Sequence, residues 1–373
     1  MYRIPAQIGA AIDDIDTPAL IVELDAFERN VGKMAEFARS RGVRLRPHAK
    51  THKCPAIALK QIAAGAIGQC CQKVGEAEAL VQAGVKDVLV SNEVVGESKL
   101  RRLAALAADA RVGLCFDSAA QVDAASRVAS DFGVEIDAMV EIDVGMQRCG
   151  VAPGAPASEL AKRIADAPGL RFRGLQAYHG TAQHLPTWQE RERAIQGAAQ
   201  GVRATLQAFE RAAIRCDIVS GAGTGTYALE GTSGVWNELQ VGSYVFMDVE
   251  YAKIGGRDGG RYSDFEHSLF VLTTVMSVPT SERAVVDAGL KSYSAEKGMP
   301  WVHGRSDLEV SGIADEHSKV RLGADSARLD LGDKLMLIPG HCDPSVNLHD
   351  WYVGVRNGRV ETLWPIAARG ASS

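Results

Sequence analysis

Lys50 stands in the stretch of this chain whose residue types are best suited to chemistry. Residues 46–53 read Arg-Pro-His-Ala-Lys-Thr-His-Lys, between a β-prone run at 43–45 and a helical run at 55–61. A lysine at the carboxyl end of a strand, with imidazoles beside it, can hold a carbonyl cofactor as a Schiff base. Desolvation or neighbouring cations must first lower its pKa and expose the neutral amine. The same residues also fit a solvated basic turn, and this segment alone leaves both interpretations open.

A glycine-rich turn after another β-prone run is suited to binding an anion. Residues 220–226 read Ser-Gly-Ala-Gly-Thr-Gly-Thr, so backbone N–H groups can approach a ligand closely and two threonine hydroxyls can add donors. Gly242, Ser243 and Tyr244 can add donors from the next predicted strand. The order does not match the nucleotide-binding P-loop, and a single phosphate group fits better. A tight turn without a ligand is the alternative.

His341 and Asp343, in the run Pro-Gly-His-Cys-Asp-Pro at 339–344, are candidate metal ligands. They are separated by one residue, so in an extended backbone both point to the same side. An imidazole nitrogen and a carboxylate oxygen together suit Mn²⁺, Mg²⁺ or Zn²⁺, and water or substrate could fill the remaining positions. A plain histidine in a turn is the alternative.

Two further candidates follow predicted strands. Tyr178 and His179 end one strand and could serve as an acid–base pair or as a stacking platform. A half-buried structural pair fits equally well. Arg148 follows the strand that carries Glu141 and Asp143, so it could neutralise a cofactor oxygen or form a salt bridge to those acids.

The elements that position these residues alternate between β-prone runs and amphipathic helical segments. Eight β–α units in about 210 residues fit a parallel (β/α)₈ barrel better than a doubly wound open sheet, which remains the alternative. The predicted strands are 43–48, 66–71, 87–92, 111–116, 137–142, 172–177, 216–219 and 240–247, and the predicted helices are 74–83, 99–108, 118–132, 158–167 and 187–213.

Polar residues end most of these strands, and the carboxyl ends of barrel strands form one mouth where active sites lie. We therefore expect the strand-end residues to converge. They are Lys50, Gln72, Asn92, Asp117, Asp143 with Arg148, Tyr178 with His179, the turn 221–226, and Asp248.

The chain is predicted to contain two domains. Residues 18–264 form the barrel, and residues 265–373, with 1–17, form a β-rich domain that carries His341 and Asp343. An additional strand at 19–24, which the second domain could share, is followed by a helix with Asp25 as its N-cap. Later strands are expected at 271–276, 284–287, 334–338 and 351–356, with a hairpin turn at Asn357-Gly358.

Composition places the chain among ordinary globular proteins. It has 373 residues, 46% of them hydrophobic, and a formal net charge of −5, which gives no reason to expect a nucleic-acid partner. No apolar run approaches the roughly 18 residues of a membrane-spanning helix, and the first residues do not resemble a signal peptide. Seven scattered cysteines without a CxxC pair indicate reduced thiols, with Cys70 and Cys71 buried, and a cytoplasmic protein.

Seven dispersed motifs resemble those of the pyridoxal-phosphate enzymes with the alanine racemase fold, in the branch of D-threonine aldolase, D-3-hydroxyaspartate aldolase and D-serine dehydratase. They cover nearly the whole chain and lie at 46–53, 70–78, 90–96, 141–145, 176–180, 242–248 and 339–344. The resemblance implies an alanine racemase-like fold, a PLP-binding (β/α)₈ TIM-type barrel with a C-terminal β-rich domain, and a homodimer.

The resemblance also implies roles for single residues. Lys50, not Lys53, would carry pyridoxal 5'-phosphate, and His179 would assist proton transfer. His341 and Asp343 match the aldolases' ligands for a divalent metal, Mn²⁺ or Mg²⁺ in the first place and Zn²⁺ as the alternative. The remaining cofactor-binding positions are Arg148 at the phenolic oxygen, Tyr178, Gln240 at the pyridine nitrogen, and Gly223, Thr224, Gly242, Ser243 and Tyr244 around the phosphate.

The implied activity is retro-aldol cleavage of a D-β-hydroxy-α-amino acid to glycine and an aldehyde. In the dehydratases the second metal ligand is typically a cysteine two positions after the histidine, and here that position is Asp343, which favours the aldolases. The implied substrate is of the D-threonine type. A D-3-hydroxyaspartate aldolase that gives glycine and glyoxylate, a D-serine or 3-hydroxyaspartate dehydratase, a racemase and a non-catalytic cofactor carrier are the alternatives. The β-rich segment argues against the carrier, and a racemase would need a second base that the sequence does not identify.

Overall fold

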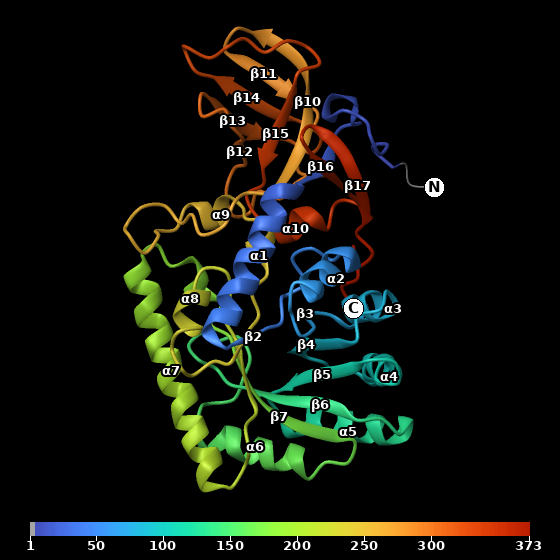
Figure 1. The fold of residues 1–373 in the computed structure, drawn as a ribbon, viewed down its shortest axis with the longest axis vertical. Coiled ribbons are helices and arrows are strands. Elements are labelled where there is room, and N and C mark those ends of the chain that lie inside the picture. Colours follow the sequence, from blue (N-terminus) through green and yellow to red (C-terminus); the bar gives the residue numbers. More distant parts are fainter. Residues whose placement is uncertain (1–3) are drawn as a thin grey trace. The chain divides into compact units, whose positions relative to one another are not determined.

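The computed structural model describes residues 4–373, which divide into two compact units (Figure 1). The barrel unit comprises residues 33–50, 55–242 and 370–373. The sheet unit comprises residues 51–54, residues 243–369 and the described residues up to Gly32. The predicted domain boundary at residue 264 stays a prediction, although the chain changes unit at Ser243.

Eight parallel strands form the sheet of the barrel unit. A bridge between His48 and Cys70 joins its two edges, and the N–H of Ala49 donates to the carbonyl of Cys70 at 2.7 Å. The sheet therefore closes on itself, and the predicted barrel is confirmed. In spatial order the strands are β2 (Arg44–Leu45), β9 (Glu238–Leu239), β8 (Ile218–Gly221), β7 (Leu170–Ala177), β6 (Ile136–Glu141), β5 (Arg111–Phe116), β4 (Asp87–Glu93) and β3 (Gln69–Cys71).

Two long helices of the barrel unit begin at capping boxes in the sequence. Ser118 accepts the N–H of Gln121 at the start of α5, and Thr187 accepts that of Glu190 at the start of α7, each with a reciprocal bond. Among the described residues, no helix has the length and apolarity needed to cross a membrane. The helices are α1 (Leu24–Arg41), which begins in the sheet unit, α2 (Pro55–Ala63), α3 (Val74–Gln82), α4 (Glu97–Leu106), α5 (Ala119–Phe132), α6 (Ala155–Ala165), α7 (Trp188–Arg211) and α8 (Tyr227–Glu230).

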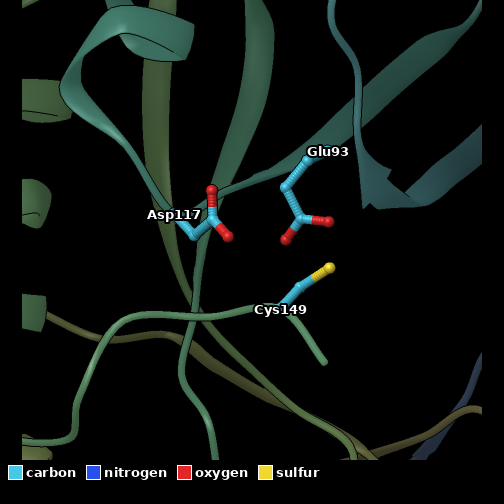
Figure 2. A group of neighbouring side chains, drawn as sticks. All are labelled: Glu93, Asp117 and Cys149. Carbon is cyan, nitrogen blue, oxygen red and sulfur yellow. The ribbon is translucent and has the colours of Figure 1, made fainter. Parts of the chain in front are cut away.

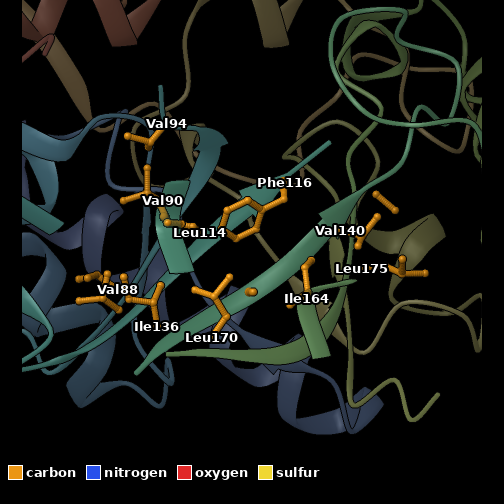
Figure 3. Packing of buried hydrophobic residues seen from close by; sticks show 14 of the residues in the cluster. Val88, Val90, Val94, Leu114, Phe116, Ile136, Val140, Ile164, Leu170 and Leu175 are labelled. Carbon is orange, nitrogen blue, oxygen red and sulfur yellow. The ribbon is translucent and has the colours of Figure 1, made fainter. Parts of the chain in front are cut away.

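The main apolar core of the barrel unit lies between the sheet and these helices (Figure 3). Val90 pairs with Leu114 across neighbouring strands, and both face this core. Alternation along β3 sends Cys71 into the same core and Cys70 into a smaller cluster with Met139. The prediction that both cysteines are buried is confirmed.

The sheet unit contains nine strands, and its first strand comes from the start of the chain. β1 pairs antiparallel with β10 and parallel with β16, so the additional strand predicted near residue 19 belongs to this sheet. The hairpin β16–β17 turns at Asn357 and Gly358, both with positive φ, as predicted. In spatial order the strands are β11 (Arg283–Val286), β14 (Ser318–Leu322), β13 (Leu308–Ile313), β12 (Trp301–Val302), β15 (Lys334–Ile338), β10 (Leu269–Thr280), β1 (Ala19–Glu23), β16 (Trp351–Arg356) and β17 (Arg359–Pro365).

Two local predictions are wrong. The segment 240–247 is not a strand: β9 has already ended at Leu239, and a 3-10 turn, η3 (Ser243–Val245), follows. The N–H groups of Phe246 and Met247 both donate to the carbonyl of Ser243, a compact turn that a buried apolar run does not reveal by alternation. Asp25 is not the N-cap of α1, because the carboxylate of Glu23 accepts the N–H of Ala26 at 2.7 Å.

Arg46 is a buried cation inside the barrel unit. Its Nη1 lies 2.5 Å from Oδ1 of Asp87 in β4, and its Nε lies 3.2 Å from Oε1 of Glu238 in β9. Burial would lower the pKa of Arg46, but the charges of Glu238 and Asp87 outweigh it and raise that pKa. The ion pairs therefore fasten the residue after β2 to two other strands of the barrel.

Replacing Arg46 with methionine should destabilise the barrel unit strongly. The substitution leaves the carboxylate of Glu238 buried without its closest cation, which typically costs about 3–5 kcal/mol. Urea-induced unfolding measured by circular dichroism checks this. Arg163→Met is the matched control, because Arg163 pairs with Asp123 on the exposed surface and should contribute little. Equal effects of the two substitutions would contradict the role of Arg46.

Candidate functional site

Lys50 lies in the turn after the bridge residue His48, at the carboxyl end of the barrel strands. Its backbone N–H donates to Nδ1 of His48 at 3.4 Å, and Oγ of Ser91 lies 3.1 Å from Nε2 of the same ring. With Nδ1 accepting, a neutral His48 carries its proton on Nε2, toward Ser91. His48 therefore ties the lysine turn to the end of β4. Lys53 belongs to the sheet unit, where its carbonyl accepts the N–H of Ala368.

Glu93, Asp117 and Cys149 come together at the carboxyl ends of the barrel strands (Figure 2). One potential ligand atom of each lies within 4.8 Å of the others, which meets the geometric requirement for a metal site. A cysteine binds metal as the thiolate, however, and here burial together with Glu93 and Glu141 raises the pKa of Cys149 to about 11. We therefore assign no metal to this group.

Glu141, at the end of β6, is a buried acid beside this cluster. Burial, together with the charge and hydrogen bond of Glu93, raises the pKa of Glu141 to about 8, while Arg148 opposes the shift. Glu141 therefore keeps its proton near neutral pH. The guanidinium of Arg148 lies 3.9 Å from Glu141 and 6.0 Å above the ring of Tyr178. The charge of Arg148 is thus only partly matched, and its half-exposed side chain can receive another anionic oxygen.

His179 is half-buried next to a tight glycine loop. A Cβ atom at Gly145, where φ is +117°, would lie 2.9 Å from Nε2 of His179, so the loop can approach the ring only as glycine. Oγ1 of Thr181 lies 3.2 Å from Nδ1. Burial lowers the pKa of His179, and the charge of Asp143 opposes this. His179 is therefore a neutral base near pH 7, as acid–base chemistry requires.

Asp143 acts on the same loop rather than as a free acid. Burial would raise the pKa of Asp143, but the N–H groups of Gln147 and Gly145, at 3.0 and 2.9 Å, outweigh it and lower that pKa. Of the other strand-end residues, Asn92 donates to the carbonyl of Gln72. Asp248 belongs to the sheet unit, where it caps the short helix α9 (Val249–Ala252).

The glycine-rich turn after β8 is closely packed and keeps a free donor. Gly223 and Gly225 lie against Gln183, with no room for a side chain on either. In the described part of the chain, the N–H groups of Gly223 and Gly242 make no hydrogen bond. Two unpaired donors that follow neighbouring strands fit a phosphate group.

Gln240 stands directly after β9, in a chain of buried polar groups. Its amide exchanges two hydrogen bonds with the amide of Gln176, and its Nε2 donates to Oγ of Ser220 at 2.7 Å. Ser220 in turn donates to Glu238, the partner of Arg46. Gln240 is therefore held in one orientation, with a lone pair of Oε1 as its remaining hydrogen-bonding capacity.

The predicted metal ligands lie in the sheet unit. His341 precedes the helix α10 (Cys342–Val346), and Asp343 lies in the first turn of that helix, so the expected extended backbone at 341–343 is wrong. Asp248 accepts the N–H of Cys342 at 3.0 Å and fixes this start. Nδ1 of His341 lies 2.5 Å from Oε1 of Glu296. A carboxylate on one ring nitrogen is the usual support of a metal-binding histidine, which leaves Nε2 for the ion.

Ser243 and Tyr244 are both buried at the start of η3 in the sheet unit. The ring of Tyr244 packs against Phe265, with 5.6 Å between the ring centres. The contacts of Ser243 and Tyr244 with a phosphate stay predictions. Both residues directly follow Gly242 in the chain.

Sequence reasoning missed several residues that shape the site. Glu93 could have been found, because it directly follows the predicted strand 87–92. Glu296, the partner of His341, and Gln183, which contacts the glycine-rich turn, lie outside the predicted strands and helices, 45 and 42 residues from these partners. Such long-range pairs leave no local pattern in a single sequence.

The proton retained by Glu141 should make the free energy of unfolding depend on pH. The pKa of Glu141 is about 8 in the folded state against an ordinary 4.5, so the folded chain binds more protons between these values and its stability falls as pH rises. Glu93→Gln removes the neighbouring charge and should flatten this dependence. Denaturant unfolding midpoints from about pH 5 to about pH 8 measure it. Glu97→Gln on the surface of α4 is the control, and an unchanged slope in Glu93→Gln would mean that burial alone retains the proton.

Comparisons with known proteins cover the whole described chain. Residues 22–250 match the family model "Alanine racemase, N-terminal domain", and residues 268–355 match the model "Putative serine dehydratase domain". A 3-hydroxy-D-aspartate aldolase from Paracoccus denitrificans (strain Pd 1222) and a D-threonine aldolase from Arthrobacter sp. are each 46% identical to this chain. In both cases 99% of this chain and 96% of the relative are covered.

A solved structure agrees with these matches. The crystal structure of D-threonine aldolase from Filomicrobium marinum superposes with a TM-score of 0.96 at 48% identity, covering 99% of this chain and 100% of the other. The resemblance of the motifs is thereby confirmed. This chain belongs to the alanine racemase-like family, in the branch that includes D-threonine aldolase and 3-hydroxy-D-aspartate aldolase.

Proposed function

We propose that this chain is a carbon–carbon lyase that cleaves D-β-hydroxy-α-amino acids of the D-threonine type to glycine and an aldehyde. Its full-length likeness to two aldolases is the observation that carries the proposal. The barrel supports it with a lysine, a neutral histidine and unpaired backbone donors at the carboxyl ends of its strands.

Lys50 is proposed to bind pyridoxal 5'-phosphate covalently. Lys50 belongs to the same unit as the glycine-rich turn and Arg148, whereas Lys53 belongs to the other unit, which favours Lys50 as the cofactor lysine. When bound, the cofactor supplies an electron sink for the bonds at the substrate's Cα. Every other step falls to side chains of this protein.

The cofactor's polar groups have proposed partners in the chain. Gly223, Thr224 and Gly242, with Ser243 and Tyr244, would hold the phosphate, and the unpaired N–H groups of Gly223 and Gly242 support this. Arg148, with Tyr178 beneath its guanidinium, would face the phenolic oxygen. Gln240 would face the pyridine nitrogen.

His341 and Asp343 are proposed to hold a divalent metal. Oxygen and imidazole donors suit Mn²⁺ or Mg²⁺, with Zn²⁺ as the alternative, and Glu296 would orient the His341 ring. Such an ion supplies Lewis-acid polarisation of a hydroxyl. Asp343 adds the negative charge that retains a divalent cation at a site with so few protein ligands.

His179 and Lys50 are proposed to move the protons. Neutral His179 would accept the proton of the β-hydroxyl at the ring nitrogen not occupied by Thr181, and Oγ1 of Thr181 would hold the ring. As the hydroxyl becomes a carbonyl, the Cα–Cβ bond breaks and its electron pair remains with Cα. The amine of Lys50 would then return a proton to Cα to complete glycine.

A 3-hydroxy-D-aspartate aldolase is the second candidate, because that relative matches as well as the D-threonine aldolase. Its substrate carries a further carboxylate, and Arg257, Arg261 and Lys291 are cations of this chain that could bind it. Lys291 already pairs with Glu316 at 2.5 Å, and Arg261 lies over the ring of Trp301, so neither is an uncommitted cation. A dehydratase is the third candidate, because the second family model bears that name.

We further propose that the protein is a cytoplasmic homodimer. All seven cysteines are free thiols, as expected in a reducing compartment. The dimer follows from the resemblance to the family, and sedimentation equilibrium of the purified protein would measure it.

The products identify the reaction. The protein loaded with pyridoxal phosphate and Mn²⁺ should convert D-threonine to glycine and acetaldehyde in equal amounts, and D-3-hydroxyaspartate, assayed beside it, would give glycine and glyoxylate. Chelation should abolish cleavage while the cofactor stays bound, and added Mn²⁺ should restore it, because only the metal polarises the hydroxyl. Chromatography of the amino acids and aldehydes measures both.

Other product patterns would contradict this assignment. Ammonia with a keto acid would identify a dehydratase, and an inverted but uncleaved amino acid would identify a racemase. Cleavage that survives thorough metal removal would exclude a role for the ion, and cofactor binding without any turnover would identify a carrier.

Replacing Lys50 with alanine should abolish both the visible absorbance of covalently bound cofactor and the cleavage of substrate. Both depend on the amine of Lys50, because no other lysine of the barrel unit would replace it in the covalent bond to the cofactor. Spectra of reconstituted protein measure the band, and Lys53→Ala is the matched control, which should retain it. A band that persists in Lys50→Ala and disappears in Lys53→Ala would transfer the assignment to Lys53.

A further inference from the structure

Gln183 connects two parts of the candidate site that lie on different segments of the barrel unit. It sits fully buried in the short helix η2 (Thr181–His184) after β7. Its Nε2 donates to the carbonyl of His179 at 3.2 Å and to Oγ1 of Thr226 at 2.7 Å. Its Oε1 accepts the N–H of Gly225 at 3.0 Å. One amide therefore contacts both the histidine loop and the glycine-rich turn.

The chemistry of its neighbours fixes which way this amide points. The N–H of Gly225 can only donate, so it must face Oε1, and the carbonyl of His179 can only accept, so it must face Nε2. The hydroxyl of Thr226 accepts a hydrogen bond from Gln183 and donates one to Oε1 of Glu230, 2.7 Å away. A flipped amide would place its NH₂ group against the N–H of Gly225 and its oxygen against the carbonyl of His179. Only one orientation of the Gln183 amide therefore satisfies all of these hydrogen bonds.

Glu230 ends this chain as a neutral acid. Its carboxyl is buried, and Oε2 has no hydrogen-bond partner in the part of the chain that the structure describes. Burial raises the pKa of Glu230 to about 8, against the opposing hydrogen bond of Thr226. The support beneath the turn therefore places no negative charge beside the proposed phosphate.

The glycine-rich turn is packed directly onto Gln183. A Cβ atom at Gly223 would lie 2.6 Å from the side-chain Oε1 of Gln183. A Cβ atom at Gly225 would lie 2.1 Å from the backbone carbonyl oxygen of Gln183. The turn cannot move toward Gln183, and the hydrogen bonds keep it from moving away. The direction of the unpaired N–H of Gly223 thus depends on where this glutamine lies.

We propose that Gln183 is a positioning residue that holds the phosphate-binding turn and the His179 loop in one fixed relation. Resting on the function proposed above, this inference deepens it: selectivity for the phosphorylated cofactor and placement of the catalytic imidazole depend on the same buried amide. Gln183 touches neither cofactor nor substrate and acts through Gly225, Thr226 and the backbone of His179.

The preference of the apoprotein for pyridoxal phosphate over pyridoxal tests this proposal. Both compounds can react with Lys50, so the ratio of their dissociation constants reports the phosphate contacts alone. Gln183→Met fills the same space without hydrogen bonds and should reduce this ratio by about tenfold, since the donors lose a buried partner. Thr226→Val should reduce it less, and Thr226→Ser, which keeps the hydroxyl, should preserve it.

A matched control separates positioning from loss of stability. Gln69 is equally buried and donates to the carbonyl of Ala58 and to Gln61, away from the turn, so Gln69→Met should leave the ratio unchanged. The ring resonances of His179, assigned by NMR in the apoprotein, should shift in Gln183→Met and not in the control. Thr226→Val carries the same test if Gln183→Met does not fold.

The possible failures are distinguishable. If the wild-type apoprotein does not prefer pyridoxal phosphate to pyridoxal, the proposed phosphate turn itself is wrong, and the role of Gln183 falls with it. If the wild type is selective, and Gln183→Met keeps both the ratio and the His179 resonances, only the positioning role is overturned.

Discussion

The buried ion pairs of Arg46 with Asp87 and Glu238 are the constraint on which the barrel depends. They fasten the segment before Lys50 to two other strands, at the place where the first and last elements of the barrel meet. Glu238 also accepts a hydrogen bond from the hydroxyl of Ser220, which in turn accepts one from the amide of Gln240. A single polar chain thus extends from a structural cation to a proposed cofactor contact. A change at Arg46 should therefore alter the orientation of Gln240, because consecutive members of this chain are joined by hydrogen bonds.

The proton positions around the site share one physical origin. Glu141 and Glu230 are both buried carboxyls whose pKa values rise to about 8. His179 is shifted in the opposite direction, so burial keeps all three groups neutral near pH 7. Positive charge remains on the half-exposed Arg148 and on unpaired backbone N–H groups. Burial therefore removes the negative charges of Glu141 and Glu230, so these two acids do not repel an anionic ligand.

The sequence was a reliable guide wherever local patterns carried the information. Alternation between β-prone and amphipathic runs located most barrel elements, and the Asn357–Gly358 turn was correct because its backbone demands those residue types. The prediction of a strand at 240–247 was wrong because buried apolar residues occur in strands and in compact turns alike. Gln183 and Glu296 stayed hidden because the partners that make them important lie 42 and 45 residues away along the chain. The roles of Lys50, His341 and Asp343 rest on motif spacing, which a single chain can reveal without showing how the motifs meet.

The pairing of β1 determines when the sheet unit can be completed during synthesis. Leu20 pairs with Val271 on one side and with Tyr352 on the other, so the first strand must wait for nearly the entire chain. The barrel, whose strands follow one another in order, can assemble while the ribosome is still producing the last hundred residues. Until then β1 is a hydrophobic strand with two unsatisfied edges, the kind of segment that chaperones shield from aggregation. The position of one short strand therefore delays completion of this sheet until its C-terminal strands have been made.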